Sequence, residues 1–210
     1  MALNWVSPFF SYEDIMTKPT SMTELEAVNV LLTTIGEAPV NTLTGNQVTD
    51  VTIAKQVLNE ISREVQAQGW HFNTEDGVEL MPNQFKKILV PADTARIDAT
   101  DYNIVQRGGE LFDLDKRSYE FQSKIKVSIV YFQDFLQLPD VAKRFITTRA
   151  SRIFSDRMLN SEVIHKMTSR DEQKALIDLK EYQGDTADFN MMDSYSVSRV
   201  MNRGFNRKVL

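Results

Sequence analysis

Three pairs of carboxylates are the residues of this chain best suited to do chemistry. Neighbouring carboxylates can act as the general acid and general base of a hydrolase, or they can hold a divalent cation. Asp113 and Asp115 form the strongest pair, because alternate residues of a strand share a face. Charged turns and sheet rims explain all the pairs more simply, and we favour that interpretation; the pairs are Glu75 and Asp76, Asp98 and Asp101, and Asp113 and Asp115.

Other catalytic and cofactor patterns are missing from the sequence. The chain has no cysteine and only two histidines, His71 and His165, which fall in different predicted elements and give no metal-ligand spacing. Gly108 and Gly109 lack the context of a phosphate-binding loop, so we interpret them as a turn. No G-x-S-x-G sequence positions a nucleophilic serine. We therefore predict no catalytic residue, no cofactor and no metal, and a protein that is not an enzyme.

Length and composition are those of an ordinary globular protein. The chain has 210 residues, 42% of them hydrophobic and 25% charged, which is enough to bury a sizeable core. Its net charge of −5 opposes non-specific attraction to DNA phosphates. No apolar run approaches the roughly 20 residues that cross a bilayer, and the N-terminus lacks the order of a signal peptide. We expect a soluble intracellular protein without a membrane partner.

The first predicted helix has clear start and stop signals in the sequence. Thr23 and Glu26 form a capping box, and Gly36 and Pro39 supply a left-handed end and a stop. Four apolar residues fall on one predicted face at steps of three and four: Leu25, Val28, Leu32 and Ile35.

A second helix is predicted to start at Thr49 or Asp50 and to run until Gly69, before Trp70. Its predicted apolar stripe consists of Ile53, Val57, Leu58, Ile61 and Val65. The short connection between the two helices favours an antiparallel pair.

The segment after Trp70 has the pattern of short strands and turns. Asp76-Gly77 predicts a hairpin between residues 70–73 and 78–81. In residues 124–132 apolar and polar side chains alternate, so one face should be buried. Further strands are predicted at residues 87–90, 95–97, 102–106 and 110–114, with Arg107-Gly108-Gly109-Glu110 as a tight turn.

Two more helices are predicted after Pro139, with a boundary at Asn160 or Ser161. The third helix should bury Phe145, Ile146, Ile153, Phe154 and Met158, and the fourth should bury Ile164, Met167, Leu176, Leu179 and Tyr182.

We therefore predict an α+β fold: a four-helix bundle in two helix pairs, with an inserted small antiparallel β-sheet or partly closed barrel and an extended C-terminal tail. The predicted parts are an N-terminal extension (1–20), a helical bundle (21–69 and 138–184), a β domain (70–137) and a tail (185–210).

Both ends of the chain have unusual compositions. Trp5, Phe9, Phe10 and Tyr12 near the N-terminus should cover a surface, either on this chain's own core or on another subunit. The tail has no acidic residue after Asp193 and mixes cations with apolar groups. It can be a solvated terminus, a DNA-binding segment, or a segment that orders against a protein, which we favour. Its candidate partner-binding residues are Arg199, Arg203, Phe205, Arg207 and Lys208.

Several segments between residues 22 and 195 share a resemblance to one family. They are residues 25–29, 35–43 and 59–73, the turn Arg107-Gly108-Gly109, residues 143–152, and Asn190-Met191-Met192-Asp193. Together they resemble the tail tubular protein A family of short-tailed, T7-like bacteriophages. The shared structural motif positions are Gly36, Pro39, Gly69, Trp70, Gly108 and Gly109.

The resemblance implies an adaptor, also called a gatekeeper or head-tail connector. Such a protein forms a dodecameric ring below the portal of the virus head, with the tail nozzle protein beneath it and DNA passing through without specific binding during ejection. It implies a virion tail protein, assembled in the host cytoplasm, in which residues 190–210 contact the portal and residues 70–132 contact the nozzle. The alternative that we keep is an envelope polysaccharide or peptidoglycan hydrolase built on the β insert.

Overall fold

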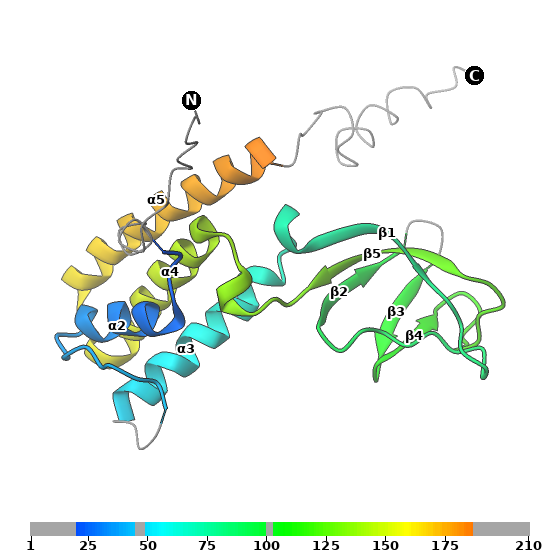
Figure 1. The fold of residues 1–210 in the computed structure, drawn as a ribbon, viewed down its shortest axis with the longest axis horizontal. Helices are drawn as coiled ribbons and strands as arrows, with labels where there is room; N and C mark the ends of the chain where they lie inside the picture. The colour runs from blue at the N-terminus through cyan, green and yellow to red at the C-terminus, as the bar shows by residue number, and fades with distance from the viewer. Residues whose placement is uncertain (1–19, 45–48, 100–102, 187–210) are drawn as a thin grey trace, which may run out of the picture.

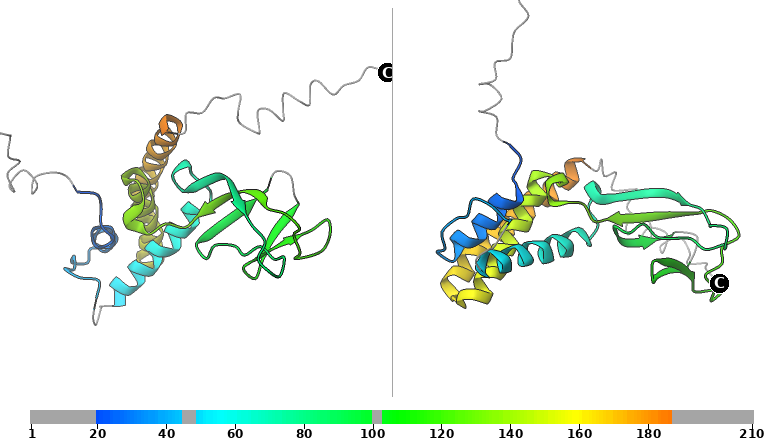
Figure 2. Two further views of the ribbon diagram at one scale, coloured as in Figure 1. Left: turned by 45° about the vertical axis from the view of Figure 1, so that its right-hand side comes forward. Right: turned by 60° about the horizontal axis from the view of Figure 1, so that its bottom comes forward.

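The computed structural model describes residues 20–44, 49–99 and 103–186. Over these residues the chain forms four α-helices and five β-strands, so the predicted α+β class is correct. The helices gather at one end of the molecule and the strands at the other (Figure 1), and two further views show the same separation (Figure 2). The first 19 residues and residues 187–210, which hold most of the predicted tail, lie outside the described part.

Helix α2 (Glu24–Thr34) has the ends that the sequence predicts. The hydroxyl of Thr23 accepts the Glu26 amide, and the Glu26 carboxylate accepts the Thr23 amide at 2.7 Å, which completes a capping box. At the other end the Glu37 amide donates to the Leu32 carbonyl at 3.0 Å, and Gly36 has a φ of +89°. This is a Schellman ending, in which glycine takes the left-handed position.

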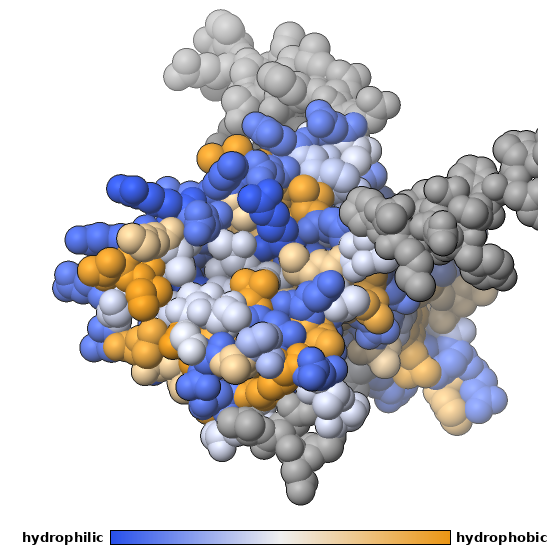
Figure 3. Space-filling view, turned by 60° about the vertical axis from the view of Figure 1, so that its left-hand side comes forward, coloured by the Kyte–Doolittle hydropathy of each residue, from blue (hydrophilic) through white to orange (hydrophobic). Residues whose placement is uncertain are grey.

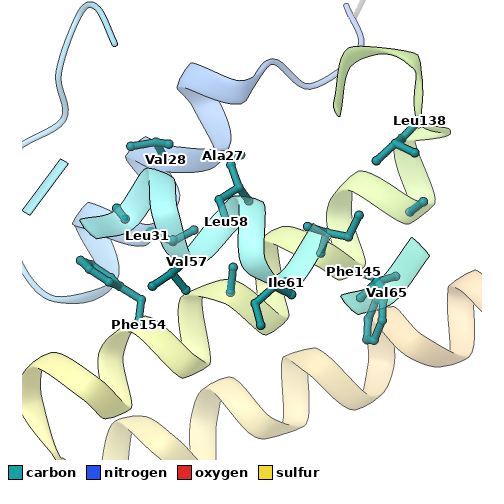
Figure 4. Close-up of a cluster of buried hydrophobic side chains, with 14 of the residues drawn as sticks. Ala27, Val28, Leu31, Val57, Leu58, Ile61, Val65, Leu138, Phe145 and Phe154 are labelled. Carbon is teal, nitrogen blue, oxygen red and sulfur yellow. The ribbon is translucent and has the colours of Figure 1, made fainter. Parts of the chain in front are cut away.

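The buried face of α2 differs in part from the predicted one. Ala27, Val28, Leu31 and Leu32 are buried, whereas Leu25 and Ile35 are only partly buried. The reason is that α2 packs against two helices, α3 and α4, so its buried arc lies between the two contacts. Figure 4 shows α2 side chains meeting those of α3 and α4 in this core.

Helix α3 (Thr49–Gln66) follows its predicted stripe more closely. Four of the five predicted residues are buried, and Ile53 is partly buried. The buried hydrophobic side chains of α3 are Val51, Ala54, Val57, Leu58, Ile61 and Val65.

Helix α4 (Asp140–Leu159) lies at the centre of the bundle and packs against α2, α3 and α5. Phe145, Ile146 and Phe154 are buried as predicted, but Met158 is 37% exposed. Asn160 ends α4 in the left-handed conformation, with a φ of +49°. Met158 lies in the last turn before this end, where the neighbouring helices cover less of α4.

Helix α5 (Glu162–Thr186) is the element whose burial the sequence predicts least well. Of its predicted stripe only Leu179 is buried, and Met167 is 64% exposed. Ala175 is the other buried residue of this 25-residue helix. The main helix contact of α5 is with α4, so one side of α5 packs and the opposite side stays open.

The strands form two antiparallel sheets, so the sheet alternative is correct and a barrel does not form among the described residues. Strand β5 (Ile125–Tyr131) lies between β1 (Thr74–Leu80) and β2 (Thr94–Asp98). Ile125, Val127 and Ile129 are buried, as the alternation predicts. The second sheet is a hairpin of β3 (Ile104–Arg107) and β4 (Glu110–Asp113), and both glycines of its turn have positive φ.

Two strand predictions are wrong. The hairpin at Asp76-Gly77 does not form, because β1 continues through it and absorbs Gly77 in a register shift against β5 between Glu75 and Val78. A short 3-10 helix, His71–Asn73, occupies the place of the predicted first hairpin strand. Residues 87–90 form only an isolated bridge between Leu89 and Glu110 rather than a strand.

Each end of the molecule has its own hydrophobic core. The helices and Trp70 share one cluster of buried side chains, and the strands share another around Leu111, Phe121 and Ile129. The two units are joined by α3 leading into β1, and by β5 leading through the 3-10 helix Phe135–Gln137 into α4.

Candidate functional site

The strongest predicted catalytic pair is occupied by structural hydrogen bonds. Asp113 is 3% exposed, and its Oδ1 accepts the amides of Lys116 at 2.9 Å and Asp115 at 3.0 Å. The Lys116 amide bond and the further amide and ammonium contacts lower the pKa of Asp113. Asp115 lies beyond the end of β4, where it accepts the side-chain amide of Asn103. The two carboxylates are therefore not alternate strand residues on one face. Asp113 instead accepts hydrogen bonds from the backbone of the turn that follows β4.

The other predicted groups are dispersed. Asp76 accepts the hydroxyl of Ser128, Asp98 accepts the amide of Ala99, and Asp101 lies outside the described residues. His71 begins the 3-10 helix, while Nδ1 of His165 lies 2.9 Å from the Asp156 carboxylate. Among the residues that the structure describes, no cluster of three His, Asp or Glu side chains could hold a metal ion, and no helix is long and apolar enough to cross a membrane.

A cleft of about 550 Å³ lies at the corner between α4 and α5. Small-molecule sites are usually lined by hydrophobic and aromatic side chains with a few polar groups. The side chains that line this cleft are instead all polar or charged: Asp156, Asn160, Ser161, Glu162, His165 and Lys166. None of the side chains that line the cleft is hydrophobic.

The junction between the two units is held by buried side-chain amides. The Asn73 side-chain amide donates to the carbonyls of Gln66 at 2.9 Å and Tyr131 at 2.8 Å, and its oxygen accepts the Trp70 amide. Gln66 in turn accepts the Gln133 amide at 2.7 Å and donates to the Gln133 carbonyl. These bonds connect the segment that leads from α3 to β1 with the segment that leads from β5 to α4. They therefore fix how the helical unit meets the β unit.

Gly69 and Trp70 complete this junction. Gly69 has a φ of +80°, and Arg96 from β2 lies against it. The Trp70 indole donates to the Val65 carbonyl at 2.8 Å while its ring packs in the helical core. Of the other motif positions, Gly36 ends α2, Gly108 and Gly109 form the β3–β4 turn, and Pro39 lies exposed after α2.

A buried lysine joins the start of the described chain to α4. The Lys143 side chain is 1% exposed, and its ammonium donates to the Leu136 carbonyl at 3.0 Å and to the Ser21 hydroxyl. Asp140 accepts the amide of Met22. Ser21 and Met22, which precede α2, therefore lie beside the N-terminal end of α4.

The periodicity of the sequence reveals neither the buried amides nor this lysine. Gln66, Asn73 and Gln133 stand at the ends of predicted elements, where polar residues are usually solvated. One signal could have located them: residues 66–73 combine a helix end, a left-handed glycine and a tryptophan. This combination marks a chain reversal, whose backbone groups need hydrogen-bond partners.

The side of α4 between α3 and α5 is bridged by ion pairs. Arg149 lies 2.6 Å from the Glu64 carboxylate of α3 and 3.5 Å from the Glu172 carboxylate of α5. Arg157 makes two bonds of 2.9 Å to Glu60 of α3. The four arginines of α4 that form ion pairs with carboxylates are Arg144, Arg149, Arg152 and Arg157.

The side of α4 between α2 and α5 is an open groove of about 370 Å³. Its walls carry hydroxyl groups, three charged side chains and one exposed valine. The lining residues are Val30 and Thr34 from α2, Arg144, Thr148 and Ser151 from α4, and Thr168, Asp171 and Lys174 from α5. A space-filling view toward the helical end shows hydrophobic side chains in several separate groups between hydrophilic ones (Figure 3).

Large hydrophobic side chains are exposed on both units. On the helical unit they include Met158, Leu159, Val163, Met167 and Ile177, and on the β unit they are Met81, Phe85 and Leu89. The predicted tail residues Arg199, Arg203, Phe205, Arg207 and Lys208 lie outside the described residues.

Comparison with known proteins gives concordant matches. A family model described as tail tubular protein matches residues 25–189. The chain is 31% identical over 128 residues to tail tubular protein A of Klebsiella phage KP34, an alignment that covers 60% of this chain and 67% of that protein. The family match includes both the helical and the β unit. The chain therefore belongs to the tail tubular protein family, and it is a structural component of a bacteriophage virion tail.

Proposed function

We propose that this protein is the adaptor subunit that joins the portal of the phage head to the tail nozzle. Membership of the tail tubular protein family supports the proposal, as does the division of the chain into two units with separate cores. The observation that carries it is the buried amide junction, because a subunit that links two partners must hold its two ends at a fixed angle.

Copies of the chain would form a ring, which we infer to be a dodecamer. Oligomers that repeat one head-to-tail contact close into rings when the rotation fits. Residues 190–210 would contact the portal, and the β unit would contact the nozzle. Exposed Phe85 and Met81, which are 68% and 70% exposed, make the β unit suited to a protein contact.

DNA would pass through the channel of this ring without specific binding. Twelve copies at −5 each carry about −60, and a wall with net negative charge repels phosphates. A channel of this kind lets DNA slide during ejection instead of retaining it.

The protein would act without catalysis. The alternative of an envelope hydrolase depends on Asp113 and Asp115, and Asp113 is buried and hydrogen-bonded within its own turn. No observation on the β unit favours that alternative.

Deletion of residues 190–210 tests the portal contact. The shortened chain should keep a cooperative urea-unfolding transition, as circular dichroism measures, and should no longer co-purify with the portal. Stoichiometric co-purification of the shortened chain with portal would show that the tail is not the contact.

A further inference from the structure

We infer that the open face of α5 binds the outer face of α2 in a second copy of this chain, so that copies join head to tail. This inference depends on the proposed ring, and it names the two surfaces that form the subunit contact. It starts from the burial of α5, which packs by Ala175 and Leu179 and leaves its opposite side uncovered.

The uncovered side of α5 is a continuous stripe. Val163, Met167, Arg170, Lys174 and Ile177 follow one another at steps of four and three residues, which places them on one helix face. Val163 and Met167 are each 64% exposed, and Ile177 is 55% exposed. We call these five residues the α5 stripe. Three large apolar side chains around two cations make a surface suited to a protein partner.

The two cations of the α5 stripe differ from the arginines of α4. Neither Arg170 nor Lys174 forms an ion pair with a carboxylate in the part of the chain that the structure describes, whereas four arginines of α4 do. Glu181 continues the same spacing at the C-terminal end of the stripe. The centre of the stripe is therefore cationic and available to an acidic partner.

The outer face of α2 has the complementary character. Residues 20–44 contain three glutamates and no lysine or arginine. Glu26, Val30 and Thr33 share the face of α2 opposite its buried side, and Glu37 directly follows the helix. Val30 is 42% exposed, which gives this acidic face an apolar centre. We call these four residues the α2 face.

The charges favour contact between an α5 stripe and an α2 face over contact between two identical surfaces. Two α5 stripes facing each other would place Arg170 and Lys174 opposite their own copies, and two α2 faces would oppose glutamates. An α5 stripe on an α2 face instead joins apolar groups to apolar groups and cations to carboxylates. Within one copy the two surfaces border the same groove over α4, which Val30 lines from α2 and Lys174 lines from α5. An unlike contact that repeats from copy to copy builds a ring when the rotation closes.

Disulfide cross-linking tests this contact directly, because the chain contains no cysteine. A Val30→Cys chain is mixed with a Met167→Cys chain and oxidised. We expect heterodimers to exceed either homodimer by about tenfold, since only unlike faces attract. A statistical mixture, or a predominance of Met167→Cys homodimers, would overturn the inference.

A second experiment reverses the charges of the α5 stripe. Adding Arg170→Glu and Lys174→Glu to the Met167→Cys chain should lower the heterodimer yield about tenfold. Adding Thr33→Lys and Glu37→Lys to the Val30→Cys chain should then restore the yield. The control is Lys86→Glu with Lys126→Glu, which makes the same charge change on exposed lysines of the β unit and should leave the yield unchanged. A yield that ignores the reversal would also overturn the inference.

Two combinations of results distinguish a failure of this inference from a failure of the proposed function. Wild-type rings that bind portal, together with statistical cross-linking, would mean that the function holds and the contact is elsewhere. Specific cross-linking in a protein that never binds portal would mean that the contact holds and the adaptor role fails.

Discussion

The guanidinium of Arg96 occupies the space that a side chain on Gly69 would need. A Cβ on Gly69 would lie 2.7 Å from Nη2 of Arg96 and 3.1 Å from Cγ2 of Val130. Gly69 belongs to the connection from α3 to β1, and Arg96 belongs to β2. Gly69 and Arg96 therefore lie close together where the helical unit meets the β unit, at the junction on which the adaptor proposal depends.

Gly69→Ala should lower the free energy of unfolding by about 2 kcal/mol, because the alanine is strained at positive φ and also displaces Arg96. Gly36→Ala is the matched control. It also has positive φ but meets no atom within 4 Å, so it should cost only about 1 kcal/mol. Urea unfolding measures both. Adding Arg96→Ala to Gly69→Ala should recover part of the loss, and equal costs for the two glycines would contradict the contact.

Asn73→Ala should lower the free energy of unfolding by about 2 to 4 kcal/mol, because it leaves the buried Trp70 amide without its acceptor and removes a donor from the carbonyls of Gln66 and Tyr131. Asn59→Ala changes an exposed asparagine of α3 and should stay within about 0.5 kcal/mol. Thermal or urea unfolding compares them. A cost for Asn73→Ala as small as that of Asn59→Ala would mean that the junction is not held as described.

Local signals in the sequence predict some elements well and others poorly. The ends of α2 are predictable because a capping box and a Schellman glycine act within a few residues. The exposure of Met167 is not, because periodicity shows that a face is apolar without showing what covers it. Asp76-Gly77 misleads because a glycine at positive φ serves a β-bulge as well as a turn.

The candidate site shows the same division. The lack of the short catalytic motifs is a property of the sequence itself, because such motifs need particular residue types at fixed spacing. The side-chain amides of the buried Gln66 and Asn73 and of the partly buried Gln133 cannot be inferred, because their partners are backbone groups brought together by the fold over up to 67 residues of chain. No local pattern marks a residue whose role is to satisfy distant carbonyls.

Acid should weaken the β unit through Asp113. Its folded-state pKa lies below the ordinary value of 3.8 that it regains on unfolding. Its stabilising contribution is therefore present above pH 3.8 and is lost as the pH falls through the lower folded-state pKa. Urea unfolding from neutral to acidic pH should show a smaller acid-dependent loss in Asp113→Asn than in wild type. Parallel pH dependence of the two proteins would contradict this.

Two apolar residues one turn apart on α4 should differ sharply. Phe154→Ala should lower the free energy of unfolding by about 3 to 5 kcal/mol, because Phe154 is 0% exposed in the core shared with α2 and α3. Met158→Ala should cost less than about 1 kcal/mol, because Met158 is 37% exposed. Calorimetry of both variants checks this, and similar costs would place Met158 in the core that the sequence alone predicts.

An image of the virion tail at subunit resolution would show whether this chain joins the portal to the nozzle. We predict a closed ring of copies of this chain between portal and nozzle, with the β unit toward the nozzle. A chain found outside that position, or present without ring neighbours, would contradict the adaptor role.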